Sequence, residues 1–532
     1  MKKLAAVLAC VALIAVGVGS TASVPAARAD LRSSATAASE VAAIDWARCA
    51  DPSLHEAHAR CAMLDVPLDY DDPSGPQIQL AISRVRHTVP EEEYQGVMLV
   101  NPGGPGGSGL WFAALGQYVP DHAGDAYDWI GFDPRGVGSS QPSLSCLPKY
   151  FHGDRPPYVP RTQELETKWL ARSERYADAC EANAPELLPH MSTIDTVQDM
   201  DTIRQALGVE QVNYFGVSYG TYLGQVYATL YPGKIRRAVF DATVDPRNVW
   251  YEANLLQDLG FDRNIHIWFE WLAEYRDIYQ LGRTEEAVAR RFYDEQRALD
   301  REPAAGVVGP DEWNDAFLYA AYGQWAWTYL GEVFSGWVHH DAVNKLIRAY
   351  EWADAPGNDN VFAVYNAVQC TDVQWPQDWE TWREDNWAVY EQAPFVTWNN
   401  AWFNAPCLYW AAPASVPVAV TGDTTPVLLI SETLDAATPY EGSLYVRSVF
   451  PNSVLIAEPG GTTHAGSFSG NACVDDRIAA FLATGELPAR QPGGEADLEC
   501  DPLPQPVPSS ERGQARRPDD ALAARLIPFV RI

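Results

Sequence analysis

The order of apolar and polar residues predicts strands and helices that follow each other along most of the chain. Short, continuous apolar runs are typical of strands buried on both faces. They occur at residues 97–100, 129–133, 211–215, 237–240, 426–430 and 454–456. Apolar residues at helical spacing mark 194–207, 219–230 and 474–481. This order predicts an α/β protein with a mostly parallel central sheet, preceded by an antiparallel hairpin at 63–68 and 78–85.

The pattern changes to helical spacing alone between residues 246 and 406. Fifteen of the nineteen tryptophans fall between Trp250 and Trp410. Long insertions in such folds often carry specificity, so we expect an inserted helical lid whose aromatic residues mostly form its own core. The expected organisation is a signal peptide at 1–29, a core at 30–245, the lid at 246–406, the second part of the core at 407–500 and a C-terminal tail at 501–532, of which 502–517 is expected to be mobile.

A G-x-S-x-G motif occurs at Gly216, Ser218 and Gly220. It stands between the predicted strand 211–215 and the predicted helix 219–230, which is the context of a nucleophile elbow. Glycine neighbours let such a turn pack around a strained serine. The alternative is a serine in an ordinary glycine-rich turn, but the flanking elements favour a nucleophile.

A glycine-rich loop at 101–109 follows the buried run 97–100. A phosphate-binding loop would need a lysine followed by serine or threonine, and neither is suitably placed. The position favours the oxyanion loop of an α/β hydrolase, where a backbone N–H approaches the reacting carbonyl oxygen. We expect Gly104 to be one donor and Tyr219, at the start of the helix, to be the other, with Gly103 as the alternative to Gly104.

An acid and a base follow later strands, in loops expected at the same sheet edge. Asp435 follows the run 426–430, and His464 follows 454–456. The order Ser, Asp, His is that of α/β hydrolases. His464 would take the Ser218 proton, and Asp435 would orient and stabilise the imidazole. Glu432 is a rival acid that precedes the turn. Asp133 and Arg135 would form a turn-stabilising ion pair beside the site.

Charge and the N-terminus narrow the functional classes. The 532 residues carry a formal net charge of −32 without a basic stripe, which makes nucleic acid an unsuitable partner. Two lysines, an apolar run at 4–18 and Ala-Arg-Ala at 27–29 predict a signal peptide and a secreted protein, free or held at the cell wall. A lipoprotein anchored at Cys10 is the weaker alternative. No run is long enough to predict stable membrane insertion.

The cysteines fit an exported protein. Without Cys10, eight remain, and this even number favours disulfides. We expect local bridges 49–61, 146–180, 370–407 and 473–500. No C-x-x-C pair indicates zinc, and serine chemistry needs neither a metal nor a cofactor.

Taken together, these motifs resemble the exported tripeptidyl aminopeptidases of actinomycetes, relatives of the prolyl aminopeptidases. The resemblance is carried by 66–70, 101–109, 133–140, 216–220, 370–372, 407–410 and 435–439. It implies a serine exopeptidase that releases short peptides, such as tripeptides, from free N-termini, with Asp372 as a candidate acceptor for the substrate ammonium. Glu432 and the residues beside His464 depart from the glycines usual in that family. A carboxylesterase or lipase with the same triad, or a non-catalytic binding protein on this scaffold, would have the same core motifs.

Overall fold

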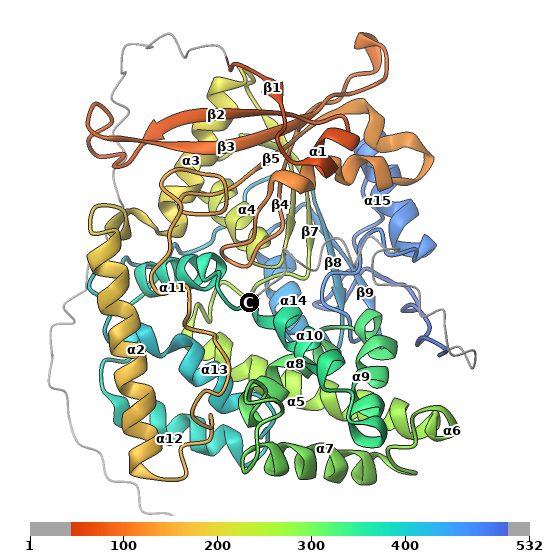
Figure 1. Cartoon of the computed structure of the whole chain (residues 1–532). Coiled ribbons are helices and arrows are strands. Elements are labelled where there is room, and N and C mark those ends of the chain that lie inside the picture. The colour runs from red at the N-terminus through yellow and green to blue at the C-terminus, as the bar shows by residue number, and fades with distance from the viewer. Residues whose placement is uncertain (1–43, 509–532) are drawn as a thin grey trace, which may run out of the picture. The chain divides into compact units, whose positions relative to one another are not determined.

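The computed structural model describes residues 44–508. The predicted signal peptide at 1–29, Cys10 and most of the predicted tail lie outside the described residues. The described chain contains one ten-stranded sheet with the strand order β1-β2-β3-β5-β4-β6-β7-β8-β9-β10 (Figure 1). The strands from β1 to β5 in this order pair antiparallel, and from β5 onward neighbouring strands pair parallel. β5 lies between β3 and β4, and β6 lies on the other side of β4.

The antiparallel part is the predicted hairpin. β2 (Arg60–Pro67) pairs antiparallel with β3 (Gln77–Val85), and β3 pairs antiparallel with β5 (Tyr127–Phe132). The short β1 (Ala47–Arg48) extends this edge by pairing with β2. The hairpin is therefore confirmed, and it extends the parallel part of the sheet at the β5 edge.

The parallel part contains the predicted buried strands. They are β4 (Gly96–Asn101), β5, β6 (Val212–Val217), β7 (Ile235–Asp241), β8 (Val427–Glu432), β9 (Ser453–Glu458) and the short β10 (Leu498–Glu499). Neighbours among them pair in parallel. The mostly parallel sheet is confirmed. Because parallel strands end at the same edge, the loops after β4, β6, β8 and β9 meet there.

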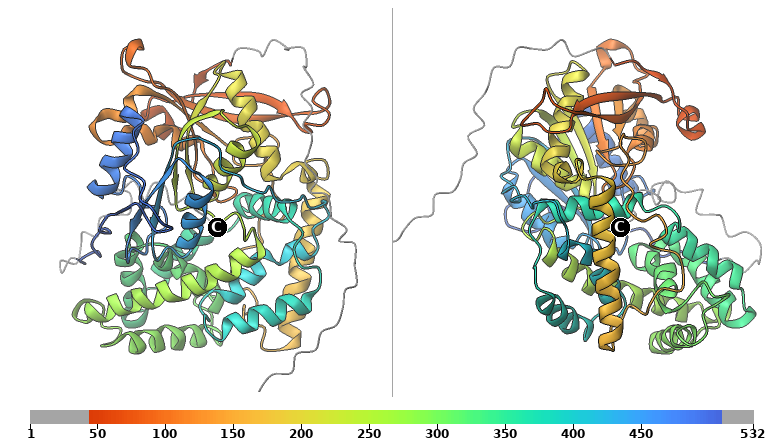
Figure 2. Two further views of the ribbon diagram at one scale, coloured as in Figure 1. Left: turned by 180° about the vertical axis from the view of Figure 1, so that it is seen from behind. Right: turned by 60° about the vertical axis from the view of Figure 1, so that its left-hand side comes forward.

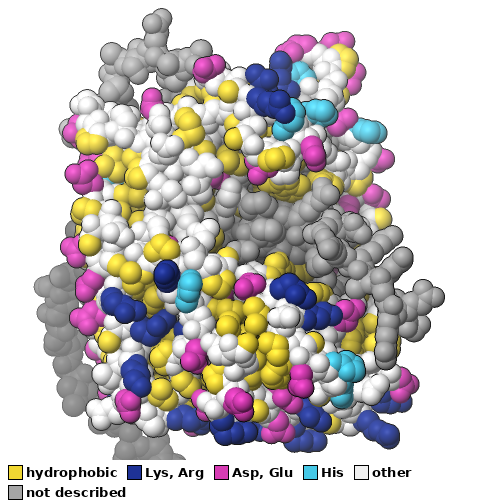
Figure 3. Space-filling view, in the orientation of Figure 1, with side chains coloured by type: hydrophobic (Ala, Val, Ile, Leu, Met, Phe, Trp, Pro, Cys, Tyr) yellow, Lys and Arg dark blue, Asp and Glu magenta, His cyan; other side chains and the backbone are white. Residues whose placement is uncertain are grey.

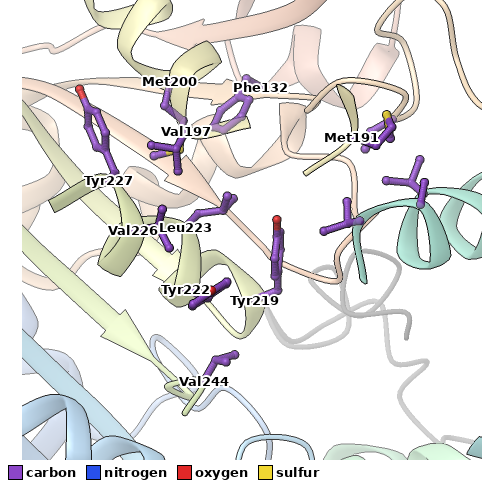
Figure 4. Packing of buried hydrophobic residues seen from close by; sticks show 14 of the residues in the cluster. Phe132, Met191, Val197, Met200, Tyr219, Tyr222, Leu223, Val226, Tyr227 and Val244 are labelled. Carbon is purple, nitrogen blue, oxygen red and sulfur yellow. The ribbon is translucent and has the colours of Figure 1, made fainter. Parts of the chain in front are cut away.

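Helices cover both faces of this sheet. Successive strand residues point to opposite faces, so Val97 and Leu99 pack in one core while Met98 and Val100 pack in the other. The first core lies beneath α3 (Thr193–Ala206) and α4 (Tyr219–Leu230), as Figure 4 shows, and extends to α14 (Tyr440–Val449). The second lies beneath α15 (Ala472–Thr484) and the 3₁₀ segments η2 (Leu110–Tyr118) and η3 (Pro120–Ala126).

The sequence pattern missed three helices outside the insert described below, one of which is α14 (Tyr440–Val449). α2 (Gln163–Asn183) is a long helix that buries only a narrow stripe, including Trp169, Tyr176 and Cys180. Such a thin apolar face produces a weak periodic signal in a mostly polar segment. The five-residue α1 (Pro52–Glu56) begins at the Asp51 N-cap. It is too short to show helical periodicity.

Between β7 and β8 the described chain contains helices and no strand. They are α5 (Tyr251–Glu274), α6 (Arg276–Tyr279), α7 (Glu285–Leu299), α8 (Pro310–Tyr322), α9 (Trp327–His340), α10 (Val343–Asp354), α11 (Asn360–Asp372), α12 (Trp379–Tyr390) and α13 (Thr397–Asn404). We call this group the helical insert. Trp268, Trp271 and Trp313 lie in its own buried cluster. Figures 1 and 2 show the insert gathered at the end of the sheet where the parallel strands finish.

All four expected disulfides are present: Cys49–Cys61, Cys146–Cys180, Cys370–Cys407 and Cys473–Cys500. The first joins β2 to the segment before α1, and the second joins α2 to the loop after β5. The third joins α11 to the turn that follows α13. The last holds the chain after β10 to the start of α15. Each bridge closes a loop of 12 to 37 residues and restricts the unfolded chain.

The described part of the C-terminal tail, residues 501–508, corrects the expectation of mobility. The Trp271 indole N–H donates to Pro506 O at 3.0 Å, and the Gln324 amide donates to Leu503 O at 3.0 Å. This part of the tail therefore packs against the helical insert. In residues 44–508, no helix is long and apolar enough to cross a membrane, and no cluster of His, Cys, Asp and Glu suits a metal ion.

Candidate active site

Ser218 occupies the sharp turn between β6 and α4. Its backbone has φ 56° and ψ −128°, a conformation that is strained for a residue with a side chain. The neighbouring glycines make this turn possible. A Cβ at Gly216 would lie 2.5 Å from the Gly220 carbonyl oxygen, and one at Gly220 would lie 2.4 Å from the Asn101 carbonyl oxygen. The elbow geometry thus follows from the motif, and it brings α4 against the loop after β4.

Gly104 and Tyr219, the expected oxyanion donors, line the same cavity as Ser218. Tyr219 is the first residue of α4, where an N–H has no partner inside the helix. The Gly103 N–H is already engaged, because it donates to Asn101 Oδ1 at 2.8 Å. The Gly104 N–H has no acceptor within residues 44–508. The geometry therefore favours Gly104 over Gly103 as an anion donor.

The Asp435 carboxylate and the His464 imidazole form a buried pair. His464 Nδ1 lies 2.8 Å from Asp435 Oδ2 and 3.0 Å from Oδ1. The Asp435 carboxylate also accepts from the Ala437 and Thr438 amides and from the Thr438 hydroxyl at 2.7 Å. Since the carboxylate only accepts, Nδ1 carries a proton, which leaves Nε2 as the nitrogen that can accept one in the neutral imidazole. Nε2 is buried and has no hydrogen-bond partner among the described residues.

Asp241, at the end of β7, links the elbow to the His464 loop. Its carbonyl oxygen accepts the Ser218 N–H at 3.0 Å, and its carboxylate accepts the Ser467 N–H at 2.8 Å. Burial raises the pKa of the Asp241 carboxyl, and the nearby His464 opposes this shift. Sequence analysis missed this residue, although an acid that ends a buried strand is a usable signal.

Glu432, the rival acid, takes a different role. Its Oε2 accepts the Thr463 N–H, and a Cβ at Gly461 would lie only 2.4 Å from that oxygen. Burial and the neighbouring Glu458 raise the pKa of the Glu432 carboxyl well above its ordinary value. The side chain therefore supports the loop before His464, and Asp435 is the acid that pairs with the imidazole.

The cavity beside Ser218 has a volume of about 350 Å³. Ser218, Tyr219, Gly104 and Asp435 line it from the core. The insert contributes one face of α5 together with Tyr365 and Gln369 of α11. Leu256 and Leu259 of α5 also line it, and 43% and 41% of their surfaces remain exposed. Partly exposed leucines at an open cavity offer an apolar surface to a ligand.

The structure corrects the expectation for Asp372, which does not line this cavity. Its carboxylate accepts from the Thr193 N–H and hydroxyl, both at 2.6 Å, and from the Trp250 indole at 3.1 Å. Trp250 lines the cavity, so Asp372 lies behind that wall. Burial raises the pKa of the Asp372 carboxyl to about 7. These contacts join α11 to α3 and to the start of the insert.

The expected ion pair between Asp133 and Arg135 is also wrong. Arg135 makes a paired contact with Asp199 of α3, with nitrogen–oxygen distances of 2.8 and 2.7 Å. Asp133 accepts from the Ser108 hydroxyl and from the Gly109 and Ser139 amides. It thereby joins the glycine-rich loop to the loop after β5.

Charged side chains of both signs lie on one face of the molecule. On the face shown in Figure 3, basic side chains are interspersed with acidic ones and do not form a continuous stripe.

Comparison with known proteins agrees with this geometry. Residues 96–464 match the family model described as alpha/beta hydrolase fold. A tripeptidyl aminopeptidase of Streptomyces lividans is 40% identical over 90% of this chain and 91% of its own length. The chain belongs to the tripeptidyl aminopeptidase family of α/β hydrolases. The resemblance inferred from its motifs is confirmed.

Other members of this α/β-hydrolase family differ in their names. The serine protease Hip1 of Mycobacterium tuberculosis is 29% identical over 84% of this chain and 89% of its own length. A carboxylesterase B of the same organism is 31% identical over 81% of this chain and 85% of its own length. A peptidase and an esterase thus share this scaffold, and the residues of the cavity must decide between them.

Proposed function

We propose that this protein is a secreted serine exopeptidase that releases short peptides, tripeptides among them, from free N-termini. The observation that carries the proposal is the cavity under the helical insert, which Ser218, Asp435 and the Gly104 and Tyr219 amides line together. The 40% identity to a tripeptidyl aminopeptidase over nine-tenths of the chain supports the peptide substrate.

Acylation begins when Ser218 Oγ attacks the scissile carbonyl carbon. His464 Nε2, which has no hydrogen-bond partner among the described residues, takes the hydroxyl proton, while Asp435 stabilises the resulting imidazolium through Nδ1. The negative charge that develops on the carbonyl oxygen is held by the Gly104 and Tyr219 N–H groups. Removing one such donor typically lowers kcat by about 10²–10³-fold.

The intermediate then collapses, and the C–N bond breaks. His464 gives its proton to the leaving amine, which departs, and the N-terminal tripeptide stays bound through its carbonyl carbon as an ester of Ser218. His464 next takes a proton from water, whose oxygen attacks the ester. The same two amides hold the second oxyanion, and Ser218 recovers its proton as the peptide acid leaves.

Residues 246–406 act as a lid that limits how many substrate residues lie on the N-terminal side of the scissile bond. The core segments at 30–245 and 407–500 precede and follow this lid in the chain. An exopeptidase must bind the substrate ammonium with an acid in the cavity. Asp245 is already paired with Arg247 at 2.6 Å. Glu441 lines the cavity and has no ion-pair partner within residues 44–508, so we assign the ammonium to Glu441 in place of Asp372.

Secretion follows from the predicted signal peptide at 1–29 and agrees with four disulfides, which persist in oxidising compartments. The protein then acts on extracellular peptides, free or held at the cell wall.

A carboxylesterase is the second candidate, because the esterase relative is 31% identical and the same triad cleaves esters. Labelling with a fluorophosphonate probe, lost in Ser218→Ala, tests the nucleophile against a non-catalytic binding protein. Chromogenic amides of one, two and three residues, compared with short-chain esters, then test the substrate. Faster turnover of esters than of every peptide amide would favour the esterase.

A further inference from the structure

One side-chain amide contacts three separate segments around the imidazole. Asn264 lies on α5 and is 1% exposed. Its Nδ2 donates to Leu434 O at 2.9 Å, to Ala321 O at 3.1 Å and to Thr462 O at 3.3 Å. Two hydrogens serve three acceptors, so one hydrogen is shared.

Each of these carbonyls belongs to a segment that contains Asp435 or His464, or to one that is hydrogen-bonded to the backbone of His464. Leu434 directly precedes Asp435, and Thr462 lies two residues before His464. Ala321 precedes Tyr322, whose carbonyl oxygen accepts the His464 N–H at 2.8 Å. The Asn264 amide therefore joins the loop of Asp435 (the acid loop), the loop of His464 (the base loop) and the end of α8, which is hydrogen-bonded to the His464 backbone.

The orientation of this amide is set by its neighbour. Arg263 Nε donates to Asn264 Oδ1 at 3.0 Å, and Arg263 also donates to Leu434 O at 2.6 Å. With the amide reversed, an oxygen would face three carbonyl oxygens and Nδ2 would face a guanidinium. The hydrogen-bond network thus assigns the amide unambiguously.

The rest of the α5 face follows the acid loop closely. The Gln257 amide donates to Ala437 O at 2.7 Å. A Cβ at Gly260 would lie 2.9 Å from Ala436 Cα, so a glycine is needed for this approach. Gln257, Gly260 and Arg263 also line the cavity beside Ser218. One helix therefore forms a wall of the substrate cavity and holds the loop of Asp435.

We propose that Asn264 is a positioning residue for the hydrolytic reaction, which sets His464 and Asp435 relative to Ser218 by tying both loops to the helical insert. The inference rests on the proposed serine hydrolase function. With this role, the helical insert both covers the active site and positions His464 and Asp435. Asn264 touches neither the substrate cavity nor the imidazole, so its effect reaches the reaction only through the loops.

The test compares Asn264→Ala and Asn264→Asp with wild type. The alanine removes the donor, and the aspartate keeps the size but places oxygens against three carbonyls. The control is Asn386→Ala on α12, a buried asparagine whose amide donates to Trp382 O at 2.8 Å within the insert. Asn264→Ser, with a shorter donor, serves if the aspartate fails to fold. The readouts are kcat, KM, the rate of fluorophosphonate labelling and the melting temperature.

We expect kcat and the labelling rate of Asn264→Ala to fall by about 10- to 100-fold, because a misplacement near 1 Å costs on the order of 10²-fold. KM should change less than about threefold, since the cavity residues are untouched. Asn264→Asp should be slower still, and Asn386→Ala should lose stability but keep kcat. Normal kcat in folded Asn264→Ala and Asn264→Asp, with Ser218→Ala inactive, would overturn this inference alone. Full activity in Ser218→Ala would instead overturn the proposed function.

Discussion

Replacing Gly220 by alanine tests how the nucleophile is placed. The new Cβ would lie 2.4 Å from the Asn101 carbonyl oxygen and 3.1 Å from Asn101 Oδ1. The first distance is roughly 1 Å shorter than a relaxed carbon–oxygen contact. The carbonyl belongs to backbone, so α4 and the glycine-rich loop must separate by most of that difference. This moves Ser218 away from Gly104, whose N–H is one of the two proposed oxyanion donors.

Overpacking of this kind costs about 1–3 kcal/mol of stability. A displacement near 1 Å at the reacting atoms costs on the order of 10²-fold in rate. We therefore expect Gly220→Ala to be folded and less stable, with kcat reduced about 100-fold on a tripeptide amide.

The matched controls separate the clash from the general effect of alanine. A Cβ added at Gly494 would meet nothing within 4 Å, so Gly494→Ala should leave kcat and melting temperature unchanged. Gly208 has φ +71° and open space, so Gly208→Ala should reduce stability through strain but leave kcat intact. Wild-type kcat and stability in Gly220→Ala would refute the close approach of α4 to the oxyanion loop.

Three further outcomes follow from the site and the fold. Ser218→Ala and His464→Ala should each lower kcat by several orders of magnitude, and kinetics of the double variant should match the singles because the groups act as one unit. Thiol titration of the unfolded, unreduced mature protein should find no free cysteine; two or more free thiols would contradict the four bridges. Because the pKa of Asp372 is raised from 3.8 to about 7, the folded state binds more protons than the unfolded state between these values. Wild type should therefore lose stability relative to Asp372→Asn as the pH rises from about 4 to 7 in denaturant titrations, and a constant difference would contradict the burial of this carboxyl.

The sequence pattern predicts the strands that are buried on both faces along their whole length. β6 and β8 are continuous apolar runs because both faces of each strand are covered, and their ends place Ser218 and Asp435. The elbow is predictable because its motif and its flanking strand and helix are local in the sequence, whereas the close approach of Gly220 to Asn101 joins distant segments. The disulfides are predictable because each joins cysteines that are neighbours in the sequence.

The parts that could not be predicted depend on packing between distant segments. Asp372 was placed by its chemistry, yet its partners Thr193 and Trp250 are 179 and 122 residues away. Arg135 pairs with Asp199 because α3 folds back over the loop after β5, which no local spacing reveals. Asn264 acts through three backbone carbonyls. Every residue has a backbone carbonyl, so the sequence does not show which of them accept its hydrogen bonds.

The most direct test of the central claim compares a tripeptide chromogenic amide with a free N-terminus to the same amide after N-acetylation. Acetylation removes the ammonium and leaves the cavity acid without its partner. Because Glu441 is an exposed side chain, losing its ion pair with the ammonium costs about 1 kcal/mol, or roughly fivefold in kcat/KM. We predict that the acetylated amide is cleaved several times more slowly, and that Glu441→Gln narrows the difference by slowing the free substrate. Equal cleavage of the two amides would contradict the exopeptidase account.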